Sequence, residues 1–281
     1  SEYADRAVMI LREKVESPDD LAESLFLLGG VAQNDETRLE HENEGVRILS
    51  SHHGPEHPLT LNARFGTAST LNNLGRYPES LEIFDQVIPL MERELGPLHD
   101  ETLTAMNNRA ITLSRMGEID AAIMGFRKVL GRYRQVYGNE HRSIANLQQN
   151  IGAMLNRLER YPEAIEALNE AARIFEIVNL PGNYSTAYPH ITLADIHGKL
   201  GNVDRLESHA SKALELLEGN LPEDHHAILK CRCLLGDALI RQGRQEQGVA
   251  IIEAVLESLS GRQVPNPRLV DECAAVLETT N

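Results

Sequence analysis

The chain has 281 residues, of which 42% are hydrophobic and only 4% aromatic, and it contains no tryptophan. Small and medium aliphatic residues suit closely packed helices better than a β-sandwich core, so the composition predicts an all-α protein. The 42 acidic and 27 basic residues give a net charge of −15. This charge argues against nucleic-acid binding and against docking on anionic membranes.

The cysteines and the N-terminal residues bear on the cellular compartment and on whether the sequence is part of a longer protein. Cys231, Cys233 and Cys273 are odd in number and clustered in the last third, which does not suggest a disulfide framework. The sequence has no membrane-spanning apolar run and no signal-peptide pattern, so we expect a cytoplasmic protein. It opens at Ser1 directly in a helical pattern, without an initiator methionine, and we therefore expect a piece of a longer protein.

The N-terminal part of the chain reads as one helix followed by one hairpin. Residues 1–16 carry apolar side chains at helical spacing and are expected to be the second helix of a truncated hairpin. Pro18 to Val31 and Thr37 to Ser51 are expected to form the next hairpin, with Gln33 at its turn.

From the second hairpin onward the sequence repeats at intervals of 42 residues. One marker is a turn position, occupied by Gly75, Gly117, Glu159, Gly201 and Gly243. The other marker is a histidine at the junction between repeats, which Asn183 replaces once. The histidines are His57, His99, His141 and His225. Two independent markers in one register, without an insertion, indicate a true repeat.

Each repeat contains two amphipathic stretches. In one copy, Leu61, Ala68 and Leu71 mark the first stretch, and Phe84 and Ile88 mark the second. Such spacings place the apolar residues on one buried stripe, so the unit is predicted to be a helix–turn–helix. A column of small residues is expected where the two helices approach most closely: Ala68, Ala110, Gly152, Ala194 and Gly236.

The C-terminal residues complete the predicted array. Pro267 to Leu277 predicts one last helix, so residues 261–281 are expected to cap the final hairpin. Residues 17–260 are expected to form about six hairpins, and no linker is long enough to separate domains. The whole chain, 1–281, is thus predicted to be a single array.

The repeat resembles the tetratricopeptide repeat in its small-residue column and in the segment Tyr161-Pro162-Glu163-Ala164. Its period exceeds the usual length of about 34 residues, and junctions such as Leu95-Gly96-Pro97-Leu98-His99 make it similar to the kinesin-light-chain subtype. The resemblance covers residues 17–260 and weakens at Asn183 to Leu193. It implies a right-handed α-solenoid of antiparallel helix hairpins, a superhelix whose concave groove, lined by first helices, binds peptide segments.

The resemblance also implies that three columns of side chains face the groove. They are Asn73, Arg115, Arg157, Lys199, Arg241; Gly66, Asn108, Asn150, Thr192, Leu234; and Asn62, Thr104, Asn146, Tyr188, Lys230. Asn both donates and accepts and so can hold a peptide backbone, while Arg pairs with carboxylates. We expect an acidic segment or a C-terminal carboxylate to bind there. The predicted ligand-binding residues are Asn108, Arg115, Asn146, Asn150, Arg157, Tyr188, Lys199 and Arg241.

The cationic column has a second interpretation. Lys and Arg near the C-terminus of a helix also cap free carbonyls and interact with the helix dipole. The asparagines could equally brace neighbouring hairpins. Asp195 and Asp237 stand four residues before Lys199 and Arg241, and ion pairs between them would neutralise the C-terminal half of the column.

No motif for catalysis, cofactor binding or metal binding stands out, so we expect neither an enzyme nor a cofactor or metal site. The junction histidines are interpreted as structural. The adjacent pairs His52-His53 and His225-His226 are expected to point in different directions. Cys231 and Cys233 would splay their sulfurs about 200° apart on a helix, given about 100° per residue.

Two functions are compatible with these features. We expect a protein- or peptide-binding scaffold or adaptor, part of a larger cytoplasmic signalling or regulatory protein, with neither nucleic acid nor membrane as a partner. The alternative is a self-association module, for example a homodimer, in which truncated ends or convex second-helix faces pair between chains.

Overall fold

The computed structural model describes residues 17–32, 34–179, 183–260 and 267–278. These residues form thirteen α-helices and one 3₁₀ turn, and they contain no β-sheet. The fold is an all-α solenoid of helix hairpins, which confirms the predicted fold class. The helix predicted within residues 1–16, the turn residue Gln33, and Pro181 and Gly182 of the irregular repeat lie outside the described residues.

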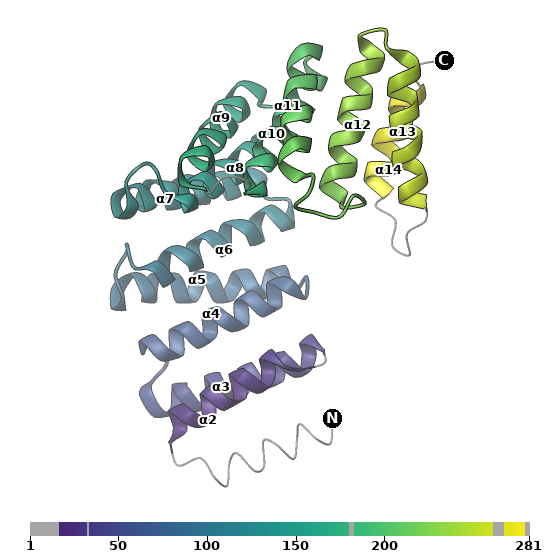
Figure 1. Ribbon diagram of the computed structural model, residues 1–281. Helices are drawn as coiled ribbons and strands as arrows, with labels where there is room; N and C mark the ends of the chain where they lie inside the picture. The colour runs from purple at the N-terminus through teal and green to yellow at the C-terminus, as the bar shows by residue number, and fades with distance from the viewer. Residues whose placement is uncertain (1–16, 33, 180–182, 261–266, 279–281) are drawn as a thin grey trace. The chain divides into compact units, whose positions relative to one another are not determined.

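The chain divides into two compact units, residues 1–136 and 137–281, and each consists of antiparallel hairpins (Figure 1). The helices of the first unit are α2 (Pro18–Gly30), α3 (Asp35–His53), α4 (Pro58–Asn73), α5 (Tyr77–Glu94), α6 (Asp100–Met116) and α7 (Ile119–Tyr137). Those of the second are α8 (Arg142–Arg157), α9 (Tyr161–Val178), α10 (Ala187–Lys199), α11 (Val203–Leu217), α12 (His226–Arg241), α13 (Gln245–Ser260) and α14 (Pro267–Glu278). The single array over the whole chain stays a prediction.

The turn inside each hairpin requires a backbone conformation that favours glycine. The turn glycines have φ between 72° and 88°: Gly75, Gly117, Gly201 and Gly243. Only glycine adopts this left-handed conformation without a steric cost. Glu159 holds the same position with a φ of 58°, and no other non-glycine residue in the described part of the chain has a positive φ. The glycine at this position of the repeat therefore reflects a requirement for a left-handed backbone conformation. Glu159 adopts this conformation at a steric cost.

The junction histidines are helix N-caps. In each of them the side chain accepts a hydrogen bond from the backbone N–H two residues later: His57, His99, His141 and His225. Asn183, where the marker lapses, makes the same bond to the N–H of Ser185 at 2.9 Å. An N-cap satisfies an N–H group that the helix leaves without a partner. The irregular repeat thus keeps the cap with a different residue, and a 3₁₀ turn (Tyr184–Thr186) then leads into α10.

The core of each unit lies between its helices, and the small-residue column marks the closest approach. Three large core side chains are fully buried: Phe84, Phe126 and Phe175. A Cβ atom at Gly152 would lie 2.5 Å from Leu168 Cγ, and one at Gly236 would lie 2.5 Å from Ile252 Cγ1. Contacts this short are sterically forbidden, so the close packing of the hairpin requires glycine at both positions.

The cysteines correct one prediction and confirm another. Cys233 of α12 and Cys273 of α14 form a disulfide, with their Cα atoms 5.8 Å apart, although the sequence suggested none. The two residues are 40 positions apart, close to one repeat, which brings them onto neighbouring first helices. Cys231 instead lies in a separate core cluster with Leu217, so the sulfurs of the Cys-x-Cys segment diverge as predicted. Burial raises the pKa of Cys231 to about 12.

In the part of the chain that the structure describes, no helix combines the length and the apolar character that a bilayer crossing needs.

Candidate ligand-binding surface

The predicted ligand-binding residues all lie on first helices of the hairpins. Asn108 and Arg115 belong to α6 in the N-terminal unit, and the other six belong to α8, α10 and α12 in the C-terminal unit. The structure separates them into two groups. In one group the polar atoms bind neighbouring helices, and in the other they have few or no partners among the described residues.

In the N-terminal unit, α6 is tied to α4 by the two predicted residues. The Arg115 guanidinium donates to the carbonyl oxygen of Asn72 at 3.2 Å, and Asn108 Nδ2 lies 3.4 Å from Ser69 Oγ. Asn72 is in the last turn of α4, where free carbonyls and the negative end of the helix dipole favour a cation. Arg115 and Asn108 therefore brace successive hairpins, which favours the second interpretation of these columns.

The C-terminal unit repeats this arrangement at Arg241. Its guanidinium donates to the carbonyl oxygen of Gly198 at 2.9 Å, and its Nε lies 2.7 Å from Asp237 Oδ1. Gly198 stands 43 positions earlier in the last turn of α10, the same step that separates Arg115 from Asn72. Arg115 and Arg241 thus each cap the preceding first helix.

Lys199 is also occupied within the chain. Its Nζ lies 2.7 Å from Asp195 Oδ2 and donates to Asn156 Oδ1 at 3.2 Å. The i,i+4 ion pairs of Lys199 and Arg241 are those that the sequence predicts. Together they neutralise the C-terminal half of the cationic column.

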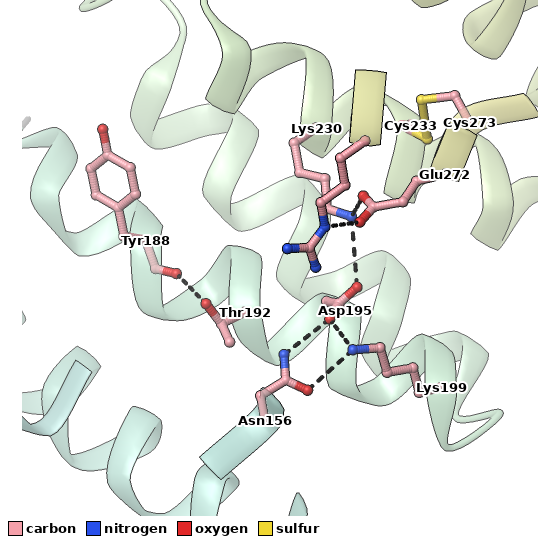
Figure 2. Close-up of polar contacts among 10 residues, drawn as sticks. Asn156, Tyr188, Thr192, Asp195, Lys199, Lys230, Cys233, Glu272 and Cys273 are labelled. Carbon is pink, nitrogen blue, oxygen red and sulfur yellow. Dashed lines mark hydrogen bonds and ion pairs between the residues drawn. A yellow bond between two sulfur atoms is a disulfide. The ribbon is translucent and has the colours of Figure 1, made fainter. Parts of the chain in front are cut away.

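Asp195 is the centre of a polar network that joins α8, α10, α12 and α14 (Figure 2). It accepts from Asn156 Nδ2 at 3.1 Å, and Lys230 Nζ lies 3.6 Å from its Oδ1. Lys230 in turn donates to Glu272 of α14 at 2.6 Å. Burial alone would raise the pKa of Asp195, but Lys230, Lys199 and Asn156 outweigh it and hold the pKa below its ordinary value. The carboxylate is therefore ionised at neutral pH.

Glu272 borders a small pocket beside this network. Burial would raise its pKa, but Lys230 and Arg268 hold it below its ordinary value. The pocket has a volume of about 220 Å³, and its other walls include Ile191, Thr192, His226 and Leu269. Sequence reasoning did not single out Glu272, although it stands 42 positions after Lys230 in the third column. The repeat spacing was the signal that could have found it.

Four predicted residues of the C-terminal unit keep available polar groups. Among the described residues, the side-chain amides of Asn146 and Asn150 have no hydrogen-bond partner, and Arg157 contacts only Met154 Sδ, at 3.9 Å. Figure 2 shows the Tyr188 side chain pointing away from the Asp195 network, and burial raises the pKa of its hydroxyl.

The three α8 residues lie on one helix face, since their spacings of four and seven positions are close to whole turns. Tyr188 occupies the position on α10 that corresponds to Asn146 on α8, one repeat later. We call Asn146, Asn150, Arg157 and Tyr188 the α8–α10 surface.

The adjacent histidine pairs correct another prediction. The ring centroids of His52 and His53 lie 4.5 Å apart, and those of His225 and His226 lie 4.8 Å apart. The expectation that these rings point in different directions is wrong, because rotation about the side-chain bonds brings neighbouring imidazoles together. Asp19 joins the first pair, with one potential metal-ligand atom from each residue within 4.8 Å of the others. A metal ion there would have to displace the hydrogen bond between His53 Nε2 and Asp19 Oδ1, at 2.6 Å.

The family model of the tetratricopeptide repeat matches residues 67–133 and 108–177. Together with the fold, this match identifies residues 67–177 as tetratricopeptide repeats. Such repeats form protein-interaction scaffolds, and the match indicates no family of enzymes. No curated protein matches the sequence.

Solved structures share the fold at low sequence identity. The apo form of RapI is 13% identical with a TM-score of 0.76, over 98% of this chain and 80% of its own. The apo form of the quorum sensor NprR from B. thuringiensis is 14% identical with a TM-score of 0.66, over 99% and 79%. A kinesin light chain-type array of nearly identical TPR-like repeats from Podosopora anserina is 19% identical with a TM-score of 0.61, over 73% and 96%. At these identities the likeness shows the fold alone.

Proposed function

We propose that the chain is a scaffold whose C-terminal unit holds an acidic segment, or the C-terminal carboxylate, of a protein partner on the α8–α10 surface. One observation carries the proposal. Asn146, Asn150 and Arg157 present available polar groups on one helix face, while Lys199 and Arg241 are occupied within the chain.

The chemistry of these side chains suits a peptide. Each asparagine amide can donate to a backbone carbonyl and accept from a backbone N–H without reading the side chains of the peptide. Arg157 is exposed and can form a bidentate pair with a carboxylate. Asn108 and Arg115 are assigned to bracing α6 against α4, and not to the ligand.

The proposed context is a sensor or adaptor segment of a larger signalling protein in the cytoplasm. The structural likeness to a quorum sensor supports the sensor role. The disulfide tests the compartment, because a reducing cytoplasm would keep Cys233 and Cys273 as thiols. When native cells are quenched in acid and the protein is then alkylated in denaturant, both buried cysteines are expected to be labelled. Labelling only after reduction would place the protein in an oxidising compartment.

A displayed library of short random peptides with free C-termini tests the ligand class without knowledge of the partner. The wild-type chain is expected to enrich peptides that carry Asp, Glu or a required free carboxylate. Arg157→Glu is expected to lose this enrichment, because it reverses the charge of the single cation among the four residues of the α8–α10 surface. The matched control is Arg134→Glu, which changes an exposed arginine on the second helix α7.

Two results would contradict the proposal. One is equal enrichment by the wild-type and Arg157→Glu chains, both still helical by circular dichroism. The other is a dimer, in sedimentation equilibrium, that Arg157→Glu dissociates, because the surface would then bind a second copy of the chain in place of a peptide.

A further inference from the structure

The first two hairpins depart from the repeat at several positions that meet around one pocket. Glu42 of α3 stands in a column that is apolar and buried in the later repeats: Phe84, Phe126, Leu168, Ala210 and Ile252. Phe26 of α2 stands in the small-residue column, and Gly45 stands where Val87 and Val129 follow. Gly66 of α4 replaces the asparagine that the next two repeats carry.

Glu42 is a buried carboxylate with one unsatisfied oxygen. The residue is 6% exposed. Its Oε1 accepts from Arg38 Nε and from Thr70 Oγ1, both at 2.8 Å. Its Oε2 is buried and has no hydrogen-bond partner. An unpaired buried carboxylate oxygen costs free energy that the apolar residue of the other repeats would not cost. This oxygen points to a donor from outside the chain.

Glu42 borders a pocket of about 520 Å³ formed by α2, α3 and α4. Its walls include Asp19, Glu23, Phe26, Leu59 and Phe65. Gly66 also borders it, and a Cβ atom there would meet nothing within 4 Å. The missing side chain therefore keeps the pocket open at a position where the next repeats carry Asn.

The aromatic wall is held in place by another departure from the repeat. A Cβ atom at Gly45 would lie 2.7 Å from the Phe26 ring, so the ring fills the space that the valine of other repeats occupies. Phe26 therefore fits into the small-residue column because Gly45 makes room for it. The combination of Phe26 and Gly45 places an aromatic ring beside the Glu42 side chain while the two helices of the hairpin stay packed together.

The net negative charge of the pocket walls favours a cationic ligand. Three carboxylates line the pocket, from Asp19, Glu23 and Glu42, against the single guanidinium of Arg38. Aromatic rings attract cations as well. One free carboxylate oxygen suits a compact ammonium group better than a planar guanidinium, which prefers two oxygens.

We propose that this pocket binds a primary ammonium group on an alkyl chain, as the lysine side chain of a protein partner carries. The ammonium group donates to Glu42 Oε2, and the alkyl chain packs against Phe26, Phe65 and Leu59. The site lies in the N-terminal unit and does not rest on the peptide proposed for the α8–α10 surface.

The probe for this site is n-butylammonium, with n-butanol as its neutral counterpart. Both are titrated into the full chain, and the NMR shifts of the Leu59 methyl groups and the Phe26 and Phe65 rings are followed. n-Butylammonium is expected to give saturable shifts at these residues, whereas n-butanol is not. Glu42→Gln is expected to weaken binding at least about tenfold, because it removes the charge of a buried hydrogen-bond partner.

Two further variants distinguish binding in the pocket from a general effect of negative charge on the protein surface. Glu40→Gln removes an exposed charge from the same helix and is expected to leave the affinity unchanged. Gly66→Leu is expected to abolish the shifts by filling the pocket, and it leaves the contacts of Glu42 intact. The proposal is overturned if n-butanol binds as tightly as n-butylammonium, if neither gives saturable shifts, or if neither Glu42→Gln nor Gly66→Leu weakens binding in a folded chain.

Discussion

At the scale of single residues, Glu159 holds a turn position that favours glycine. With φ at 58° its side chain bears the steric cost of the left-handed region. We expect Glu159→Gly to raise the free energy of unfolding by about 1 kcal/mol, which is the lower end of that cost. Urea unfolding followed by circular dichroism measures the change. Gly117→Ala makes the opposite exchange at an equivalent turn and is expected to destabilise the chain, and a lower midpoint for Glu159→Gly would contradict this account.

Gly152 illustrates a second requirement for glycine, close packing. We expect Gly152→Ala to lower the free energy of unfolding by about 1–3 kcal/mol, because the new methyl group overpacks the contact with Leu168. Gly131→Ala on α7 is the matched control, since a Cβ atom there meets nothing within 4 Å. The control is expected to be neutral or stabilising by about 0.5–1 kcal/mol. Equal losses in the two variants would show that packing is not the cause.

At the scale of elements, the α10–α11 hairpin contains three neighbouring histidines. Nδ1 of His190 and Nδ1 of His209 lie 3.0 Å apart, and the ring of His197 stacks on that of His209 at 5.5 Å. Burial lowers the pKa of all three, that of His209 to about 4. Lys212 and Arg205 lower these values further, whereas Glu176 raises that of His190.

These shifts predict a loss of stability in acid. In the unfolded chain the histidines take up protons near pH 6.5, whereas the folded chain resists protonation down to about pH 4 at His209. The contribution of these histidines to the free energy of unfolding is therefore fully present above pH 6.5, and it is lost as the pH drops toward 4. Unfolding midpoints over this range are expected to decline less steeply in His209→Leu than in the wild type. His41→Gln is the control, and identical slopes in wild type and His209→Leu would refute the assignment.

The helices follow closely from the sequence because proline and capping residues mark their starts. The segments predicted at Pro18 to Val31 and Pro267 to Leu277 correspond to Pro18–Gly30 and Pro267–Glu278. The ion pairs of Lys199 and Arg241 also follow, since both partners share one helix. The contact of Lys230 with Glu272 and the buried position of Glu42 depend on packing between helices, which composition and periodicity within one helix do not encode.

At the scale of the whole molecule, the two units carry different chemistry. The N-terminal unit has an acidic pocket around Glu42, and the C-terminal unit has the available amides and guanidinium of the α8–α10 surface. In both units the remaining basic residues of the column brace successive hairpins. A partner that engages both surfaces would combine a basic side chain with an acidic segment, so its affinity would fall as salt rises.

Hydrogen exchange of the backbone amides, with and without a peptide selected on the wild-type chain, tests the central claim most directly. The account predicts that the peptide slows exchange in α8 and α10, and that Arg157→Glu removes this protection. Protection confined to the second helices α9 and α11, or unchanged by Arg157→Glu, would contradict it.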